Sequence, residues 1–176
     1  MSDISYIRKY HSPLGTITLA CREDGLTGLW FDGQKHYGST LTGSVAEEDR
    51  PVLSLAAEWL DIYFSGREPR FTPPVSLEGT PFRRLVWQRL TAIPYGTTLT
   101  YRDLTLRMAA GGECGEGAVR AVAAAIGHNP VSLIVPCHRI VGSGGSLTGY
   151  AGGLERKEWL LRLERCGRKA CGCVSV

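Results

Sequence analysis

The chain has 176 residues, 43% of them hydrophobic and 21% charged, with a net charge of +3. This length suffices for one large domain or two small ones, and the composition is that of an ordinary globular protein. No apolar run could cross a bilayer and no signal peptide is evident, so we expect no membrane contact and a cytoplasmic location (nuclear in a eukaryote). Six irregularly spaced cysteines favour a reducing compartment over a disulfide framework.

Charge is divided unevenly along the chain. Residues 1–79 carry 7 basic and 11 acidic side chains, whereas residues 80–176 carry 13 basic and 6 acidic ones. The second half therefore has a net charge of +7 and the first half −4. A basic half of this kind suggests contact with a polyanion, with the acidic half as a support.

Short β-rich runs near the N-terminus predict three antiparallel strands, at residues 6–10, 16–21 and 26–31. Asp24-Gly25, before the third run, is a hairpin signal. The polar residues 34–48 are expected to form a loop.

Pro51 can occupy the first turn of a helix, and apolar residues then recur at helical spacing until Gly66. This helix is expected to pack on the sheet, which gives an N-terminal α/β domain at residues 1–79. No ionisable cluster in this half has catalytic spacing, and we interpret His11 and His36 as solvated or structural.

Residues 67–80 contain three prolines and are interpreted as a linker, with a short strand at 75–77. Thr80 and Pro81 then provide a helix N-cap and a proline at the first helical position. The helix that they begin extends to about Ile93.

Two further helices are predicted, from Thr100 to about Met108 and at residues 117–127. The apolar face of the later helix holds Val119, Val122, Ala123 and Ile126, and its other side holds Arg120, Ala121, Ala124 and Ala125. Small side chains let the helix backbone approach another surface, and an isolated arginine can reach past it. The pair of helices fits a helix-turn-helix, and the alternative is a helix buried on both sides.

Residues 132–135 are apolar and β-rich, and they predict a buried strand that ends at Pro136. Cys137 follows at this break, with His138 and Arg139 directly after it. Most cysteines are inert packing residues. Two ionisable side chains beside a buried thiol would nevertheless lose hydration without benefit, so we interpret Cys137 as a reactive thiol whose proton His138 can take.

The glycine-rich residues 142–153 are expected to form a loop that lines a site. A last helix is predicted at residues 154–165, with Glu164 near its end. Because an acid there opposes the helix dipole, it needs a partner, and His138 is the candidate. Residues 166–176 hold three cysteines without a zinc-binding spacing and are interpreted as a flexible tail.

Several segments in this order resemble the O6-alkylguanine-DNA alkyltransferase (methylated-DNA–protein-cysteine methyltransferase) family. They are Gly79-Thr80-Pro81-Phe82, Ile93-Pro94-Tyr95-Gly96, Thr100-Tyr101, Arg120-Ala121-Val122, Asn129-Pro130, Pro136-Cys137-His138-Arg139, Gly149-Tyr150-Ala151-Gly152-Gly153 and Lys157-Glu158-Trp159-Leu160-Leu161. The segment around Cys137 is the most specific, and the matches span residues 79–165. The N-terminal half resembles the family's less specific first domain.

The resemblance implies a ribonuclease H-like α/β domain, with a small antiparallel sheet and a packed helix, at residues 1–79. A mostly α, winged helix-turn-helix domain would follow at residues 80–165. The implied function is DNA repair by stoichiometric transfer of the alkyl group from O6-alkylguanine, and from O4-alkylthymine, in duplex DNA to Cys137. Base flipping would precede transfer, and the alkylated protein would be irreversibly inactive. The resemblance implies a monomer that binds the minor groove of double-stranded DNA and needs no metal or other cofactor.

The resemblance also implies roles for single residues. Cys137 would be the nucleophile, ionised at neutral pH by its neighbours, and Glu164 would orient His138 to draw the thiol proton through a bridging water. Asn129 would hold the active-site turn, and Tyr101 would rotate the target phosphate and donate to the guanine ring. Arg120, Ala121 and Ala124 would contact DNA, with Arg120 in the gap left by the flipped base, and Pro136, Ile140, Tyr150 and Ala151 would line the substrate pocket.

Two rival classes of protein stay open at this point, and a transcriptional regulator is a third possibility. A non-enzymatic alkyltransferase-like damage sensor would lack the reactive thiol, and the presence of Cys137 argues against it. A cysteine hydrolase with a Cys-His-Glu set would turn over repeatedly on a small acyl substrate, and the basic half argues for DNA instead. A transcriptional regulator would need a dimer and residues that read the major groove, and neither is evident.

Overall fold

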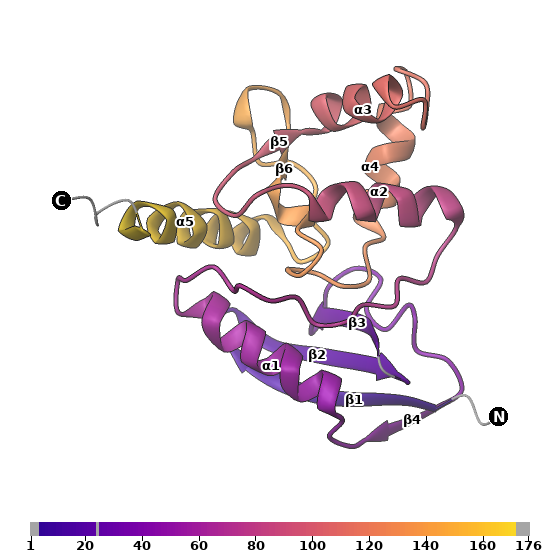
Figure 1. The fold of residues 1–176 in the computed structure, drawn as a ribbon, viewed down its shortest axis with the longest axis vertical. Helices are drawn as coiled ribbons and strands as arrows, with labels where there is room; N and C mark the ends of the chain where they lie inside the picture. The colour runs from indigo at the N-terminus through magenta and orange to yellow at the C-terminus, as the bar shows by residue number, and fades with distance from the viewer. Residues whose placement is uncertain (1–3, 24, 172–176) are drawn as a thin grey trace.

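The computed structural model describes residues 4–23 and 25–171, which form two packed bodies (Figure 1). The N-terminal body is a sheet with one helix, and the later helices form the C-terminal body above it. Among the described residues, no helix has both the length and the apolar character that crossing a membrane requires.

A four-stranded sheet in the order β3-β2-β1-β4 forms the N-terminal body. The strands are β1 (Ile4–Ser12), β2 (Gly15–Arg22), β3 (Gly25–Phe31) and β4 (Ser44–Glu47). The first three pair antiparallel, which confirms the predicted strands. β4 pairs parallel with β1, so the prediction of a loop over residues 34–48 is wrong in part and the sheet is mixed. This edge strand is short and mostly exposed, so it buries no apolar face that a hydrophobic pattern could reveal.

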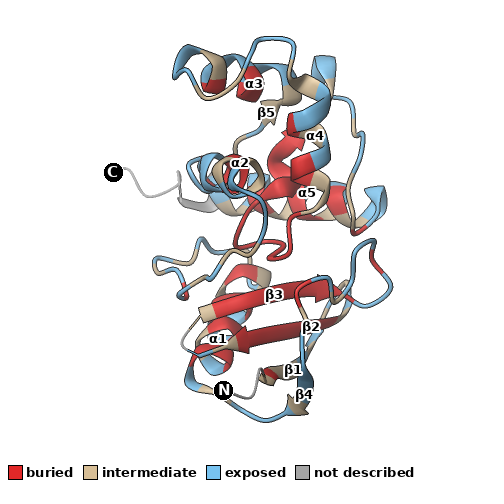
Figure 2. Ribbon diagram, turned by 90° about the vertical axis from the view of Figure 1, so that its right-hand side faces the viewer, coloured by how far each residue is buried: buried red, intermediate tan, exposed pale blue. Residues whose placement is uncertain are grey.

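Helix α1 (Pro51–Phe64) begins at its proline, as predicted, and lies across one face of the sheet (Figure 1). Its buried side chains are Val52, Leu53, Ala56, Ala57, Trp59, Leu60 and Tyr63. β2 and β3 are buried along most of their length, so the core lies between these strands and α1 (Figure 2). Full burial of each large apolar side chain contributes about 1.5–3 kcal/mol.

The linker between the bodies is attached to the free edge of β3. The Leu26 N–H donates to Pro74 O and the Ser76 N–H donates to Leu26 O, both at 2.8 Å. Val75 thus makes a single parallel bridge with Leu26, where we expected a strand over residues 75–77. These bonds fix the path of the chain into the C-terminal body.

The C-terminal body contains α2 (Pro81–Thr91), α3 (Tyr101–Ala110), α4 (Val119–Gly127) and α5 (Leu154–Cys171). Both predicted N-caps are confirmed: the Thr80 hydroxyl accepts from the Arg83 N–H at 3.3 Å, and the Thr100 hydroxyl accepts from the Asp103 N–H at 3.0 Å. β5 (Leu99–Thr100) pairs parallel with β6 (Ile140–Val141), which joins the start of α3 to the segment that follows Cys137.

Helix α4 buries a slightly different face from the one predicted. Its buried residues are Val122, Ala125 and Ile126, whereas Val119 and Ala123 are partly exposed. Ala125 was expected on the outer side, but α2 packs there, and the Trp87 indole N–H donates to Ala125 O at 2.8 Å. Arg120, Ala121 and Ala124 are exposed, as expected, so the alternative of a helix buried on both sides is wrong.

Helix α5 continues to Cys171, so Glu164 does not lie near its end, and residues 166–171 are helical rather than a flexible tail. The glycine at position 167 permits this path, because a Cβ there would lie 2.0 Å from Gly66 O. Cys166 is exposed on α5. Residues 172–176 lie outside the described part of the chain.

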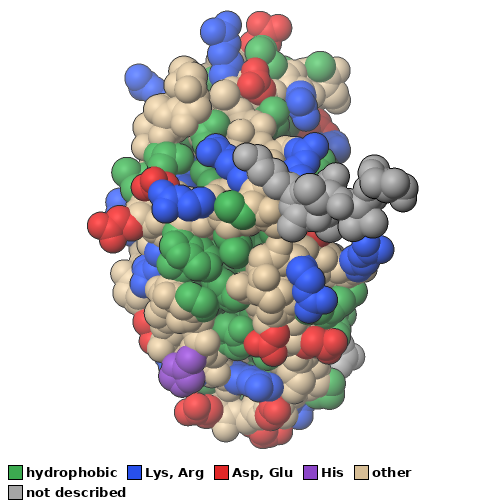
Figure 3. All heavy atoms as spheres, turned by 90° about the vertical axis from the view of Figure 1, so that its left-hand side faces the viewer, with side chains coloured by type: hydrophobic (Ala, Val, Ile, Leu, Met, Phe, Trp, Pro, Cys, Tyr) green, Lys and Arg blue, Asp and Glu red, His purple; other side chains and the backbone are tan. Residues whose placement is uncertain are grey.

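The charged side chains of the two halves can be compared on the surface. On the face shown in Figure 3, several Lys and Arg side chains lie over the upper, C-terminal body, and charged side chains of both signs are present over both bodies. The excess of basic residues in the second half of the sequence still makes the C-terminal body the better candidate for contact with an anionic partner.

Candidate active site

Cys137 begins a short 3-10 turn, η1 (Cys137–Arg139), and the residues before it form a buried turn rather than the predicted strand. Leu133 in this turn has φ +69°, a left-handed conformation that costs about 1 kcal/mol or more for a residue with a side chain. The prediction was wrong because a short apolar run has the same composition in a strand and in a buried turn. The surrounding structure must hold this strained turn in place.

Asn129 is one of the groups that hold the turn. Its Nδ2 donates to Val135 O at 2.8 Å, and its Oδ1 accepts from the Val131 N–H at 3.0 Å. Its side chain also hydrogen-bonds Cys137, which favours the thiolate. Asn129 is buried, and these hydrogen bonds replace the ones that its amide would make with water.

The N-terminal body holds the same turn from below. The Leu29 N–H donates to Pro130 O at 2.8 Å, and the Ser132 N–H donates to Leu29 O at 3.0 Å. β3 therefore adds the active-site turn to its edge through a parallel bridge at Val131. The position of the thiol depends on both bodies.

The Cys137 thiol is buried, with 5% of the residue exposed. Burial raises the pKa of the thiol, and the opposing effects of Asn129, the Lys157 charge and backbone hydrogen bonds are smaller. The expectation that its neighbours ionise Cys137 at neutral pH is therefore wrong for the free protein. His138, expected to assist, is itself buried and neutral.

His138 has a defined tautomer. Its Nε2 lies 2.6 Å from Glu164 Oε1 and 3.3 Å from the Tyr63 hydroxyl. Burial lowers the pKa of His138 and outweighs the opposite effect of Glu164, so the imidazole is neutral. Because the carboxylate can only accept, Nε2 carries the hydrogen and Nδ1 has a free lone pair. Nδ1 is fully buried and has no hydrogen-bond partner.

Glu164, also fully buried, is surrounded by donors. Arg139 donates to both of its oxygens, at 3.0 Å from Nε and 3.1 Å from Nη2. The Tyr63 hydroxyl donates to Oε1 at 2.8 Å, and the Gly96 N–H donates to Oε2 at 3.0 Å. Burial alone would raise the pKa of Glu164, but His138 and Arg139 outweigh it and hold that pKa well below its usual range. The carboxylate stays ionised, and the predicted pairing of His138 with Glu164 is present.

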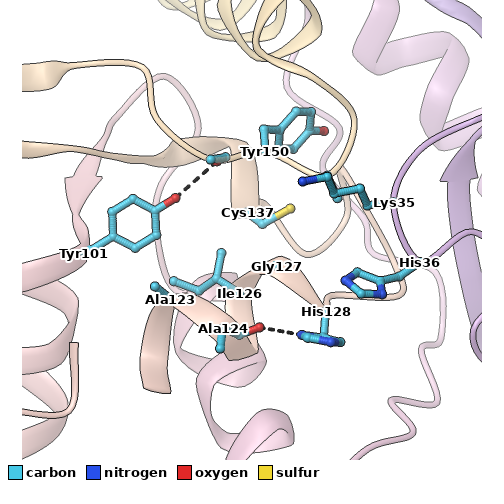
Figure 4. A pocket seen from close by; sticks show the side chains of 12 residues that line it. Lys35, His36, Tyr101, Ala123, Ala124, Ile126, Gly127, His128, Cys137 and Tyr150 are labelled. Carbon is cyan, nitrogen blue, oxygen red and sulfur yellow. Dashed lines mark hydrogen bonds between the residues drawn. The ribbon is translucent and has the colours of Figure 1, made fainter. Parts of the chain in front are cut away.

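A cavity of about 310 Å³ opens above the thiol (Figure 4). Its lining residues are Lys35, His36, Tyr101, Ala123, Ala124, Ile126, Gly127, His128, Cys137, Gly149, Tyr150 and Ala151. The volume is at the lower end of the range for small-molecule pockets. The sulfur of Cys137 points into it (Figure 4).

The predicted pocket residues divide into two groups. Tyr150 and Ala151 line the cavity, but Pro136 and Ile140 do not. Pro136 faces a separate hollow, and Ile140 is fully buried in β6 because the strand pairing turns it into the core. Arg120 lines a neighbouring hollow that shares two residues, Tyr101 among them, with the cavity.

The loop of residues 142–153 is fastened over the cavity from two helices. The Tyr101 hydroxyl donates to Thr148 O at 3.1 Å and Gly149 O at 3.2 Å. Lys157 Nζ donates to the same two carbonyls, at 2.9 Å and 3.2 Å. Burial lowers the pKa of Lys157 to about 8, with the Cys137 charge acting in the opposite direction.

Several residues of the site were missed by sequence reasoning. Tyr63 occupies the buried face of α1 and has the pattern of any core aromatic residue. Lys35 and His36 belong to a segment read as a loop, and the interpretation of His36 as solvated or structural overlooked its place in the cavity wall. The acidic half is thus more than a support. Lys157 lay within a recognised segment, but no local pattern indicated which carbonyls it contacts.

Comparison with known protein families gives one match for each of the two bodies. The family model described as "6-O-methylguanine DNA methyltransferase, DNA binding domain" matches residues 81–166. The model described as "6-O-methylguanine DNA methyltransferase, ribonuclease-like domain" matches residues 5–77. Together they span nearly all of the described chain, and their boundary falls in the linker.

Individual relatives match over most of their length. A methylated-DNA–protein-cysteine methyltransferase of Mycolicibacterium paratuberculosis is 43% identical over 90% of this chain and 91% of its own. One from Methanosarcina barkeri is 42% identical over 87% of this chain and 92% of its own. The crystal structure of Mycobacterium tuberculosis OGT in complex with DNA is 39% identical, covers 92% of this chain and 94% of its own, and superposes with a TM-score of 0.80. The chain therefore belongs to the methylated-DNA–protein-cysteine methyltransferase family.

Proposed function

We propose that this protein repairs DNA by transferring the alkyl group of O6-alkylguanine in duplex DNA to Cys137, once per molecule. The observation that carries the proposal is the pairing of a cavity-facing sulfur with a buried, neutral imidazole in the adjacent residue. The free lone pair of His138 Nδ1 is available to take a proton. The family and the basic C-terminal body supply the substrate class.

Proton removal is the first chemical step. Because burial keeps the thiol neutral in the free protein, deprotonation of Cys137 accompanies substrate binding rather than preceding it. The proton passes to Nδ1 of His138 through a water molecule. The ionised Glu164 on the opposite side of the ring stabilises the imidazolium that forms.

Alkyl transfer follows as a direct displacement. The thiolate attacks the alkyl carbon, an S–C bond forms and the C–O6 bond breaks, and the electron pair passes to the guanine. The guanine takes a proton from the Tyr101 hydroxyl, which regains one from solvent, while His138 returns its proton to solvent. Burial and the nearby Cys137 charge raise the pKa of Tyr101, which keeps this donor protonated. The reaction balances without a metal or redox cofactor.

Base flipping gives the thiol access to O6, which is not open to attack within the base stack. A cavity of about 310 Å³ leaves room for one alkylated base beside Cys137. The exposed Arg120 would occupy the gap in the stack, and Ala121 and Ala124 would let α4 lie close to the minor groove. Helices α3 and α4, with the β5–β6 pair, would act as a winged helix-turn-helix.

The product explains the stoichiometry. S-alkylcysteine is a thioether without a leaving group, so the thiol is not restored and the protein is inactivated. O4-alkylthymine presents a similar alkylated oxygen and is a second substrate under this proposal. The chemistry needs one chain and a reduced thiol, which fits a monomer acting in the cytoplasm.

Intact-mass measurement after mixing with an O6-methylguanine duplex tests the proposal. We expect one added methyl group per chain, located at Cys137 by peptide mapping. Release of more than one product per chain would instead indicate a hydrolase with repeated turnover. No mass change, or a methyl group at another residue, would overturn the proposal.

A pair of cysteine substitutions provides the matched control. Cys137→Ser should bind the duplex but accept no methyl group, because a serine hydroxyl is far harder to deprotonate. Cys166→Ser removes an exposed thiol on α5 and should react as the wild type does. Transfer to the Cys137→Ser protein would contradict the assignment of the nucleophile.

A further inference from the structure

The N-terminal body extends a short segment to the rim of the cavity. Lys35 and His36 follow β3, and both side chains are exposed and line the cavity that contains Cys137 (Figure 4). The Lys35 N–H donates to Ala151 O at 3.1 Å, which ties this segment to the loop over the cavity. The backbone of this segment is therefore fixed beside the cavity, and both side chains are exposed there.

His36 stacks on His128, which follows the last residue of α4. The ring centroids are 4.1 Å apart, and the planes are inclined by 27°. His128 Nδ1 lies 2.7 Å from Ala124 O, and because a carbonyl only accepts, this nitrogen carries a hydrogen. The Nε2 atom of His128 is then the one that can gain a proton. His36 has φ +59°, and the Ser39 N–H closes its turn by donating to His36 O at 3.2 Å.

The charged groups that act on His36 are all positive. The largest cause that lowers the pKa of His36 is partial burial. Smaller effects in the same direction come from His128, from Arg83 of α2 and from Lys35 of its own segment. Within residues 4–23 and 25–171, no salt bridge joins His36, Lys35 or Arg83 to a carboxylate. Three elements thus bring cationic or protonatable groups to one rim without a counter-charge, which is the arrangement that favours an anion.

We infer that Lys35, His36 and His128 form a binding site for a phosphodiester group of the DNA strand that carries the alkylated base. The inference rests on the proposed function. The cavity has room for a base, so the sugar-phosphate of a flipped nucleotide stays at the rim, where these side chains lie. A phosphate between Lys35 and the His36–His128 stack would supply a negative charge to this rim and favour the protonated form of His36.

Two substitutions test the site by the salt dependence of duplex binding. Lys35→Gln should weaken binding about tenfold at low salt and reduce the slope of log K against log salt by about one, as loss of one phosphate contact does. His36→Asn tolerates the left-handed backbone and removes the imidazole. With a 15-base-pair O6-methylguanine duplex, the wild type should bind more tightly as the pH falls from 8 to 6, and His36→Asn should lose much of that gain.

Arg70→Gln is the matched control, because it removes one exposed positive charge from the linker, outside the cavity wall. It should keep the wild-type salt slope.

Reaction with free O6-benzylguanine, which has no phosphate, should slow less than reaction with duplex in the Lys35 and His36 variants. If wild-type protein reacts with the duplex but all three variants share its salt slope, the phosphate site is wrong. If the wild type accepts no alkyl group at all, the proposed function fails instead.

Discussion

The two bodies of the molecule contribute to one site in different ways. The C-terminal body supplies the sulfur, the imidazole and the carboxylate. The N-terminal body supplies no atom to the transfer itself, yet the Tyr63 hydroxyl donates to Glu164 and β3 holds the turn before Cys137. The C-terminal body carries the chemistry, and the N-terminal body helps to fix the geometry of the site and the charge of Glu164.

The contribution of the N-terminal body helps to explain how Glu164 stays ionised although it is buried. Glu164 and Arg139 form a buried pair, and such a pair is tolerated only when its remaining polar atoms are satisfied. Here one of the groups that complete the network, Tyr63, comes from the other body. Separating the two bodies would therefore disturb the ionised state of Glu164 as well as the packing.

The largest expected effect is that of Glu164→Gln. The change leaves Arg139 buried without its counter-charge, so we expect a loss of about 3–5 kcal/mol in the free energy of unfolding. Alkyl transfer should slow by at least about a hundredfold, because His138 loses the anion that stabilises its charged form. Urea unfolding and single-turnover transfer measure the two effects.

Glu158→Gln is the control on the same helix. Glu158 pairs with Arg162 at 3.0 Å on the surface of α5, and both side chains are largely exposed. Its loss should change the free energy of unfolding by less than about 0.5 kcal/mol and leave transfer unchanged. Equal effects of the two substitutions would contradict the account of the buried network.

Arg120→Ala should act on DNA rather than on chemistry. If Arg120 fills the gap in the stack, reaction with an O6-methylguanine duplex should fall about 10–100-fold, because unstacking the base costs a few kcal/mol. Reaction with free O6-benzylguanine should change much less. Arg84→Ala, which removes an exposed arginine from α2, serves as the control. Equal losses on both substrates would remove the proposed role in flipping.

Tyr63→Phe should show the opposite pattern. Loss of a hydrogen bond to a charged group costs about 1.5–3 kcal/mol of stability. Because the chemistry itself is affected, transfer from duplex and from free base should slow by a similar factor, about tenfold. Tyr10→Phe is the matched control, since the Tyr10 hydroxyl donates at 2.7 Å to Asp61, a partly solvated carboxylate of α1. An effect of Tyr63→Phe confined to duplex would contradict the positioning role.

Stability should fall as the solution becomes acidic. The pKa of His138 is lowered in the folded state, so the unfolded chain binds its proton first, and this contribution is present above about pH 6.5 and lost below it. Glu164 acts in the same direction below about pH 4.3, because its pKa is also lowered. Urea unfolding between pH 7 and 5 should show the free energy decreasing, by up to about 1.4 kcal/mol per pH unit for one proton. An increase would contradict a neutral, buried His138.

Local sequence predicts several elements of the C-terminal body because their signals are local. The caps at Thr80 and Thr100 and the unusual outer face of α4 lie within a few residues of the elements they define. The pairing of His138 with Glu164 follows from the family resemblance, whereas the argument from a helix end is wrong because α5 continues to Cys171. Residues that act on near neighbours in the chain can be recognised from their spacing.

Other features depend on contacts between distant segments. Tyr63 reaches Glu164 only because α1 packs beneath α5, and no spacing reports that contact. The state of the thiol was mispredicted for the same reason, since burial of Cys137 is a property of the whole fold. The length of α5 depends on Gly167 passing the backbone at Gly66. Pairings across about a hundred residues leave no periodic trace in either segment.

The smallest expected effect, that of Thr80→Ala, compares a purely structural residue with those above. The Thr80 hydroxyl accepts from the Arg83 N–H, and its loss leaves one first-turn donor of α2 without a protein partner. We expect a cost of about 1 kcal/mol in the free energy of unfolding. Thr80→Ser should retain the cap. Because Thr80 contacts neither the cavity nor the Glu164 network, the rate of alkyl transfer should not change. A slower rate in fully folded Thr80→Ala protein would mean that α2 positions α4, and with it the cavity wall, through the Trp87 contact. In that case one part of the C-terminal body would support the site in the same way as the N-terminal body does.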